Sequence, residues 1–511
     1  MAIIFGLLLI TSQSCKHDFV DLTNPNQITT GSYWQTRSDA ISGVNSVYSA
    51  LYYDGLYLRL YPWIMDIRAD DMRNTSPWWT QEVMIYQVSP GNPCYIAPWE
   101  HNYAGIFWAN QVLTYVPGID MDETLKARIL GEAKFLRGLF YYHLLNVYRD
   151  VPLITSLPAG PEDFFPPKTP RDQVWQHVIQ DFTEAMAVLP TKQQYPPADM
   201  GRATKGAAAA YLGKTYMIIR DWANAEPLLR GIIDQQYGSY SLVADYQDNF
   251  TIRNQNNSES LFEVQFSRSV GGTTLGWAGN PSSAWSKTSG KARTYAPLGF
   301  GWGDVTPTDW IFELFQEEKT VDGELDPRMK ASMFFDYPGS TVYGRPWAEV
   351  EATLPNHVHV KKYLNDGVFP NENEWRSEIN ERIMRYADVL LLYAECLNEL
   401  GRTQEAYAYI QQVRSRANLP DLATTRPGMN QADMRDWITR ERALEFCFEA
   451  IRYVDILRWG WLEDPAMLEV LKERDAEFNN FIPGRHFMAI PPNEVDLNKN
   501  LDQDPGWTPG S

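Results

Sequence analysis

The chain has 511 residues, of which 64 are Asp or Glu and 45 are Lys or Arg, so its formal net charge at pH 7 is −19. A surface this acidic repels phosphate backbones, which excludes nucleic acid as a partner. The 4 cysteines contain no Cys-x-x-Cys pair, which excludes a zinc ribbon and a disulfide framework.

The chain begins with an apolar run at residues 3–10, followed by small and polar residues and then Cys15. The run is too short for a transmembrane helix, which takes about 20 residues. Its layout is typical of a bacterial lipoprotein signal, although the basic start is missing. We therefore expect residues 1–15 to hold this signal, with Cys15 as the lipidated first residue of an exported protein. The alternative is a buried N-terminal strand with an incidental cysteine.

Helical periodicity is clearest at residues 122–148, where apolar side chains form one stripe. A second amphipathic segment ends before Pro190, so residues 122–190 predict an antiparallel helical hairpin. The same reasoning predicts hairpins at about 39–115, 203–235 and 382–418. In the hairpin at 203–235, "DWANA" from Asp221 resembles the tetratricopeptide consensus. The sequence therefore predicts a mostly α fold built on a tetratricopeptide-like helical scaffold.

Residues 237–377 interrupt the helical pattern. They contain the strand-like segments "SLFEVQFS" and "HVHVKKYL" and a stretch rich in Gly, Ser and Thr at 271–303. We expect an insertion of loops and short strands mounted on the helices. For residues 433–511 we expect a C-terminal helix followed by an extended tail.

Five segments, in this order, resemble the SusD/RagB family of outer-membrane nutrient-binding lipoproteins from Bacteroidetes. They are "ILGEAKFLRGLFYYHLLNVYRDVPLIT", "RYADVLLLYAECLNELG", "VRSRANLP", "ITRERALEFCFEAIRYVDILRWG" and "FMAIPPNEVDLNKNLDQDPGW". The likeness covers nearly the whole chain. Two departures are small: "DQDPGW" stands where the family commonly ends in a Gln-Asn-Pro-Gly motif, and Ala450 replaces a frequent Gly.

The resemblance implies four tetratricopeptide units, a lipid anchor in the outer membrane, and a SusC-like TonB-dependent transporter on which the protein sits at the cell surface. It implies a glycan ligand, or a peptide in the RagB branch, with no catalysis and no cofactor. A peptide-binding protein of this fold is one alternative. A lipid-anchored glycoside hydrolase is another, although the sequence has neither a Gly-x-Ser-x-Gly nor a His-Glu-x-x-His motif.

Two loop regions carry the aromatic side chains that a glycan needs, because sugar rings have apolar C–H faces and polar edges. Consecutive tryptophans in an extended loop point in different directions, so at least one of the first pair is expected to be exposed. We expect both regions to converge on one ligand-binding face; the alternative is that their aromatics fill gaps over the helices. The candidates are Arg73, Asn74, Trp78 and Trp79 in the first region, and Trp277, Trp285, Tyr295 and Trp302 in the second.

His357 and His359 alternate along a predicted strand and face the same side, which could place two metal ligands together. A third ligand is missing nearby in the sequence, and zinc sites use three or four. We therefore expect a solvated strand face here and no metal.

Overall fold

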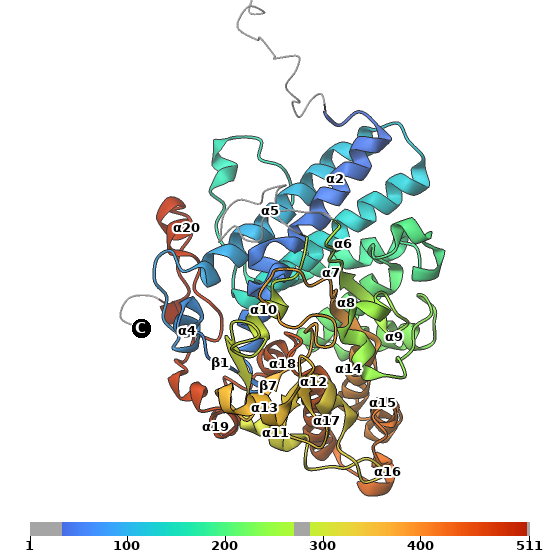
Figure 1. Cartoon of the computed structure of the whole chain (residues 1–511). Helices are drawn as coiled ribbons and strands as arrows, with labels where there is room; N and C mark the ends of the chain where they lie inside the picture. Colours follow the sequence, from blue (N-terminus) through green and yellow to red (C-terminus); the bar gives the residue numbers. More distant parts are fainter. Residues whose placement is uncertain (1–32, 270–286, 508–511) are drawn as a thin grey trace, which may run out of the picture.

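The structure is a computed structural model that describes residues 33–269 and 287–507. It is mostly helical, which confirms the predicted fold class. Figure 1 shows long helices stacked side by side through the upper and right-hand parts of the molecule. Within the described ranges, no helix combines the length and apolar character needed to cross a bilayer.

Eight long helices form a continuous array in which each helix packs against the next. They are α2 (Arg37–Ser49), α5 (Pro93–Tyr115), α6 (Glu123–Val147), α7 (Arg171–Val188), α8 (Lys205–Ile218), α9 (Trp222–Ile233), α14 (Tyr386–Glu399) and α15 (Thr403–Arg416). Such arrays bury each helical face against a neighbour, which gives an extended scaffold.

The helix ends follow local signals in the sequence. The Asp122 side chain accepts a hydrogen bond from the Leu125 N–H at 2.8 Å and caps α6. Asp221 caps α9 in the same way. Gly401 joins α14 to α15 with a φ of 79°, a conformation that glycine adopts without strain.

A buried network of charges ties the array to α17 (Gln431–Phe446) and α18 (Arg452–Trp459), which follow the short helix α16 (Leu422–Thr425). Asp388 of α14 accepts hydrogen bonds from Lys214 of α8 at 2.7 Å and from Arg442 of α17 at 2.8 Å. Arg442 also pairs with Asp455 of α18. All four side chains are buried, so each charge is stabilised by its partners and not by water.

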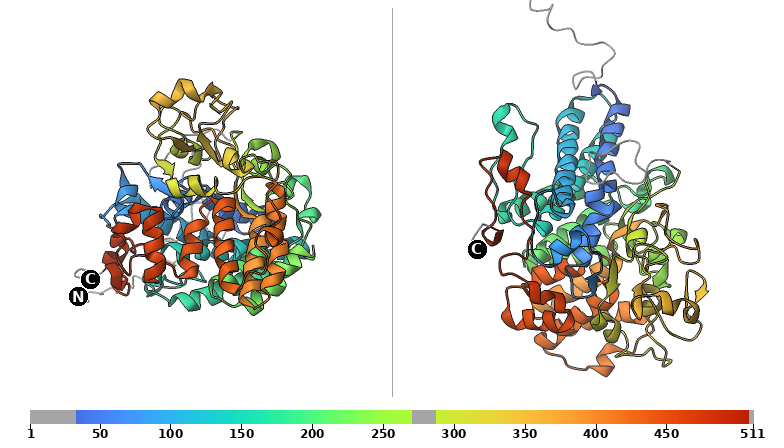
Figure 2. Two further views of the ribbon diagram at one scale, coloured as in Figure 1. Left: turned by 90° about the horizontal axis from the view of Figure 1, so that it is seen from below. Right: turned by 60° about the vertical axis from the view of Figure 1, so that its left-hand side comes forward.

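The region at 237–377 contains short strands and helices, and two of its strands pair with strands outside it. Antiparallel pairs join β1 (Met72–Asn74) to β3 (Val305–Pro307), β2 (Ser260–Val264) to β8 (Glu381–Arg385), β4 (Met333–Phe335) to β7 (Val358–Val360), and β5 (Thr341–Val342) to β6 (Arg345–Pro346). The helices α10 (Lys291–Tyr295), α11 (Asp309–Leu314), α12 (Pro327–Ser332) and α13 (Trp347–Val350) lie between the strands. Both views in Figure 2 place the yellow segments of this region on one side of the helical body.

The end of the chain differs from the prediction of one helix and an extended tail. After α17 come α18, α19 (Pro465–Arg474) and α20 (Pro492–Leu497). Pro465 and Pro492 open their helices, a position where proline is tolerated because its missing N–H has no helical partner. The prediction was wrong because the helices after α17 are short and two of them begin with proline, a residue that usually ends a helix.

Candidate ligand-binding site

Two loops far apart in the sequence meet because β1 pairs with β3. Arg73 lies opposite Thr306 in this pairing. Beyond β1, the Thr75 Oγ1 donates a hydrogen bond to the Gly303 carbonyl oxygen at 2.6 Å, and the Thr75 N–H donates to the Asp304 carbonyl oxygen at 2.9 Å. These contacts place the loop of Trp78 beside the segment that carries Trp302.

A cavity of about 780 Å³ lies where these loops meet. Helix α3 (Leu60–Asp66), helix α4 (Trp79–Met84) and the segment before β7 complete its wall. Its lining consists of Arg59, Trp63, Thr75, Pro77, Trp78, Trp79, Leu298, Trp302, Gly303, Asp304, Val305, Pro355, Asn356 and His359.

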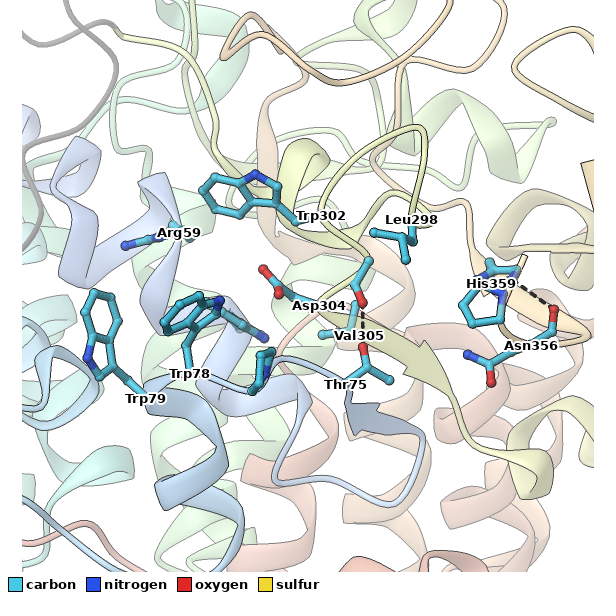
Figure 3. A pocket seen from close by; sticks show the side chains of 14 residues that line it. Arg59, Thr75, Trp78, Trp79, Leu298, Trp302, Asp304, Val305, Asn356 and His359 are labelled. Atoms are coloured by element: carbon cyan, nitrogen blue, oxygen red, sulfur yellow. Dashed lines mark hydrogen bonds between the residues drawn. The ribbon is translucent and has the colours of Figure 1, made fainter. Parts of the chain in front are cut away.

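Three tryptophans give the cavity its aromatic character. Trp78 is 69% exposed, whereas Trp79 and Trp302 are half-buried. Trp78 precedes α4 and Trp79 is its first residue, so the two side chains leave the backbone in different directions. Figure 3 shows Trp79, Trp78 and Trp302 at one end of the cavity, with the Asp304 side chain drawn between the Trp78 and Trp302 rings.

Charged groups lie among these rings. Arg59 donates two hydrogen bonds to the Asp54 carboxylate, at 3.0 and 2.6 Å, and both side chains are buried. The Arg59 guanidinium also lies 6.0 Å from the centroid of the Trp63 ring. Burial raises the pKa of the Asp304 carboxyl, while the Arg59 charge acts in the opposite direction. The cavity therefore offers hydrogen-bonding charges beside apolar ring faces.

His359 and Asn356 lie at the other end of the cavity, beyond Leu298 in Figure 3. The His359 Nε2 lies 3.0 Å from the Asn356 carbonyl oxygen, so Nε2 carries the proton and donates it. Burial lowers the pKa of His359 to about 4, and the ring is neutral at pH 7.

The solvated strand face expected for the histidine pair is wrong for His359, which is 2% exposed. Strand β7 is paired with β4 and packs against β3, so it is not a free strand face. His357 is exposed. The described residues contain no group of three His, Cys, Asp or Glu side chains placed to hold a metal ion.

The expectation for Tyr295 is wrong. This side chain is 1% exposed, and its hydroxyl donates a hydrogen bond to an Asp66 carboxylate oxygen at 2.8 Å. The short helix α10 turns Tyr295 into the core, where the buried Asp66 carboxylate accepts its hydrogen bond.

Two other candidates lie outside the cavity lining. Arg73 pairs with Asp475 at 3.1 Å and with Asp309 at 3.2 Å, so its guanidinium is held away from the cavity. The Asn74 Nδ2 donates to the Ser76 carbonyl oxygen at 2.8 Å. Trp277 and Trp285 lie outside the described residues. Of the predicted set, the structure brings together Trp78, Trp79 and Trp302.

The sequence prediction missed several polar and aromatic groups of the lining, among them Arg59, Trp63, Asp304 and Asn356. Asp304 directly follows the glycine-rich segment that carries Trp302, and this proximity was a usable signal. Arg59 and Trp63 had no such signal, because they come from a buried turn and helix of the first helical unit.

Comparisons with known proteins agree over most of the chain. The family model described as "SusD family" matches residues 258–507, and the one described as "Starch-binding associating with outer membrane" matches residues 18–217. "SusD-like protein P25" from Formosa agariphila is 27% identical over 98% of this chain and 97% of its own length.

Solved structures share the fold. A SusD superfamily protein from Bacteroides vulgatus aligns with a TM-score of 0.81 and 27% identity, over 93% of this chain and 100% of its own. The surface glycan-binding protein A from Bacteroides thetaiotaomicron, solved in complex with laminarihexaose, aligns with a TM-score of 0.73 and 21% identity, over 92% of this chain and 100% of its own. The two family matches, the relative of equal length and the common fold lead to one conclusion: the chain belongs to the SusD-like family.

Proposed function

We propose that this protein is a cell-surface lipoprotein that binds an oligo- or polysaccharide in the tryptophan-lined cavity and delivers it to a SusC-like TonB-dependent outer-membrane transporter. The observation that carries the proposal is the meeting of Trp78, Trp79 and Trp302 at one cavity of about 780 Å³. A cavity of this size accommodates a small ligand or several sugar units of a longer chain.

The chemistry of the lining suits a sugar. Indole faces stack on the C–H faces of pyranose rings, while ring hydroxyls need hydrogen-bond partners at the edges. Asp304 supplies acceptor oxygens between two of the tryptophans, and Asn356 supplies an amide at the far end. A ligand that fits is apolar on its faces and polar around its rim, as a glycan is.

The comparisons support carbohydrate as the ligand class. The description of the N-terminal family model refers to starch binding and to the outer membrane, and one structural neighbour was solved in complex with laminarihexaose. The lipid at Cys15 and the transporter partner follow from the family resemblance. An anchor of this kind raises the effective concentration of the binding site at the transporter.

Calorimetry with a glycan panel tests the proposal. Trp78→Ala and Trp302→Ala should each lose about 1–2 kcal/mol of binding free energy, and the double variant should bind at least about tenfold more weakly. Phe164→Ala is the matched control, because Phe164 is exposed and does not line the cavity. Unchanged affinity in the double variant, with an intact circular dichroism spectrum, would show that the glycan binds at another site.

The same protein should bind without cleaving. Glycoside hydrolysis usually requires a pair of carboxyl groups that flank the scissile bond. Release of reducing sugar from a bound polysaccharide would mean that the protein is a hydrolase and would overturn this proposal. Binding of a peptide panel, with no glycan bound, would favour the peptide-uptake alternative.

A further inference from the structure

Arg293 lies directly behind the aromatic wall of the cavity. The backbone of α10 pairs with the segment that forms this wall: the Trp302 N–H donates to the Arg293 carbonyl oxygen at 2.9 Å, and the Asp304 N–H donates to the Thr294 carbonyl oxygen at 3.1 Å. The guanidinium carbon of Arg293 lies 4.9 Å from the centroid of the Trp302 ring. Arg293 is therefore in contact with a side chain that lines the cavity.

A second tryptophan holds the same guanidinium. Arg293 lies 5.6 Å from the centroid of the Trp375 ring, and Trp375 meets Trp302 edge to face with centroids 5.3 Å apart. Trp375 is packed on Gly290, where an added Cβ would come within 2.2 Å of the indole. The close approach permitted by this glycine fixes the position of Trp375, and the two indoles fix the guanidinium between them.

The charge of Arg293 is not balanced by a carboxylate. Within residues 33–269 and 287–507, no acidic side chain pairs with it, and its Nε–H is buried without a hydrogen-bond partner. Burial also lowers its pKa. Nearby Arg59 differs, since it forms two hydrogen bonds to Asp54. Arg293 is only half-buried and its terminal N–H groups are open to solvent, so an anion or another acceptor can reach them.

We infer that Arg293 is a specificity-determining residue that selects an acidic glycan, one whose sugars carry carboxylate or sulfate groups. This inference rests on the proposed function, because it requires a glycan at the Trp302 wall. The guanidinium lies over the Trp302 ring, so a substituent of a sugar that packs against this indole comes within its reach. There a planar guanidinium binds a carboxylate or sulfate through paired hydrogen bonds.

Matched neutral and acidic ligands test the inference. The probes are laminarihexaose, the same hexaose oxidised at C6 to carboxylates, its O-sulfated form, and a wider panel of neutral and acidic polysaccharides. The wild-type protein should bind acidic probes about tenfold or more tightly than neutral ones, the range expected for hydrogen bonds to a charged group. The preference should fall as salt is added. The two acidic forms distinguish carboxylate from sulfate.

Three variants separate charge from packing. Arg293→Gln should remove the preference, whereas Arg293→Lys should keep part of it because the charge remains. Arg426→Gln is the control, since Arg426 also lies on an indole, 5.5 Å from the Trp437 centroid, but does not line the cavity. It should behave as wild type. Thermal unfolding checks that each variant is folded.

The outcomes distinguish the two proposals. Equal binding of neutral and acidic probes, a preference that survives in Arg293→Gln, or its loss in the Arg426→Gln control would overturn the role of Arg293 and leave glycan binding intact. If no glycan of the panel binds, the proposed function falls, and this inference falls with it.

Discussion

Thr75 donates a hydrogen bond from its Oγ1 to the Gly303 carbonyl oxygen at 2.6 Å, which links the loop of Trp78 to the segment of Trp302. Thr75→Val removes the donor and keeps the shape of the side chain. We expect unfolding free energy to fall by about 0.5–1.5 kcal/mol. Glycan affinity should fall severalfold, because the two tryptophans lose a contact that sets their spacing. Urea unfolding and calorimetry measure the two effects.

Thr75→Ser is the matched control, since it restores the hydroxyl and should bind as wild type. If Thr75→Val binds glycan with full affinity, the β1–β3 pairing and the backbone hydrogen bond from Thr75 to Asp304 hold the two loops together without the hydroxyl.

Ala450 adopts a left-handed backbone conformation, with φ of 59°, at a position where the family resemblance expects a glycine. Its N–H donates to an Asp66 carboxylate oxygen at 2.6 Å, which holds it there. Ala450→Gly should relieve about 1–2 kcal/mol of local strain, partly offset by about 0.5–1 kcal/mol of added chain entropy in the unfolded state. We expect a net gain of up to about 1.5 kcal/mol in unfolding free energy. A loss of stability in urea unfolding would mean that the Ala450 methyl group makes a packing contact worth more than the strain.

Asp388 is the carboxylate that joins α8, α14 and α17 through Lys214 and Arg442. Asp388→Asn leaves these buried cations short of negative charge, and we expect a loss of about 3–5 kcal/mol in unfolding free energy. Glu226→Gln is the control: its pair with Arg402 is partly exposed and should be worth less than about 1 kcal/mol. Similar losses of unfolding free energy in the two variants would show that burial does not determine how much this network stabilises the fold.

Cys15→Ala tests the anchor. Without the thiol no lipid attaches, so the protein should appear in the soluble fraction of cells that lack the proposed transporter partner, while the purified protein keeps its glycan affinity. Retention on washed membranes from such cells would contradict the lipoprotein interpretation.

The long helices were predictable because their signals are local and repeated. In α6 the apolar stripe runs over many turns and Asp122 supplies the cap, so the predicted range of 122–148 lies within one residue of the observed helix at each end. The pairing of β1 with β3 was not predictable. Each strand has three residues, too few for an alternating pattern, and the partners lie more than 200 residues apart.

The candidate site shows the same limit in its side chains. Trp302 and Tyr295 come from one glycine-rich region, yet one lines the cavity and the other is in the core. The difference depends on Asp66, a buried acceptor from a distant helix that only the folded chain brings to Tyr295. Composition identified an aromatic surface, whereas tertiary contacts decided which rings belong to it.

His359 gives the cavity a dependence on pH. Its pKa is about 4 in the folded protein and about 6.5 when unfolded, so between these values the unfolded chain binds more protons. Stability is therefore fully present above about pH 6.5 and is lost as the pH falls toward 4. From pH 7 to pH 5 this one side chain should remove about 2 kcal/mol of unfolding free energy.

His359→Gln isolates this contribution, because Gln keeps an N–H for the Asn356 carbonyl oxygen but does not titrate. Other titrating groups are the same in both proteins and cancel in the difference. Wild type should be the more stable at pH 7, and its advantage should shrink by about 2 kcal/mol at pH 5. Urea unfolding of both proteins at the two pH values measures the change. An advantage that stays constant would mean that His359 is protonated in the folded state at pH 5, which its burial opposes.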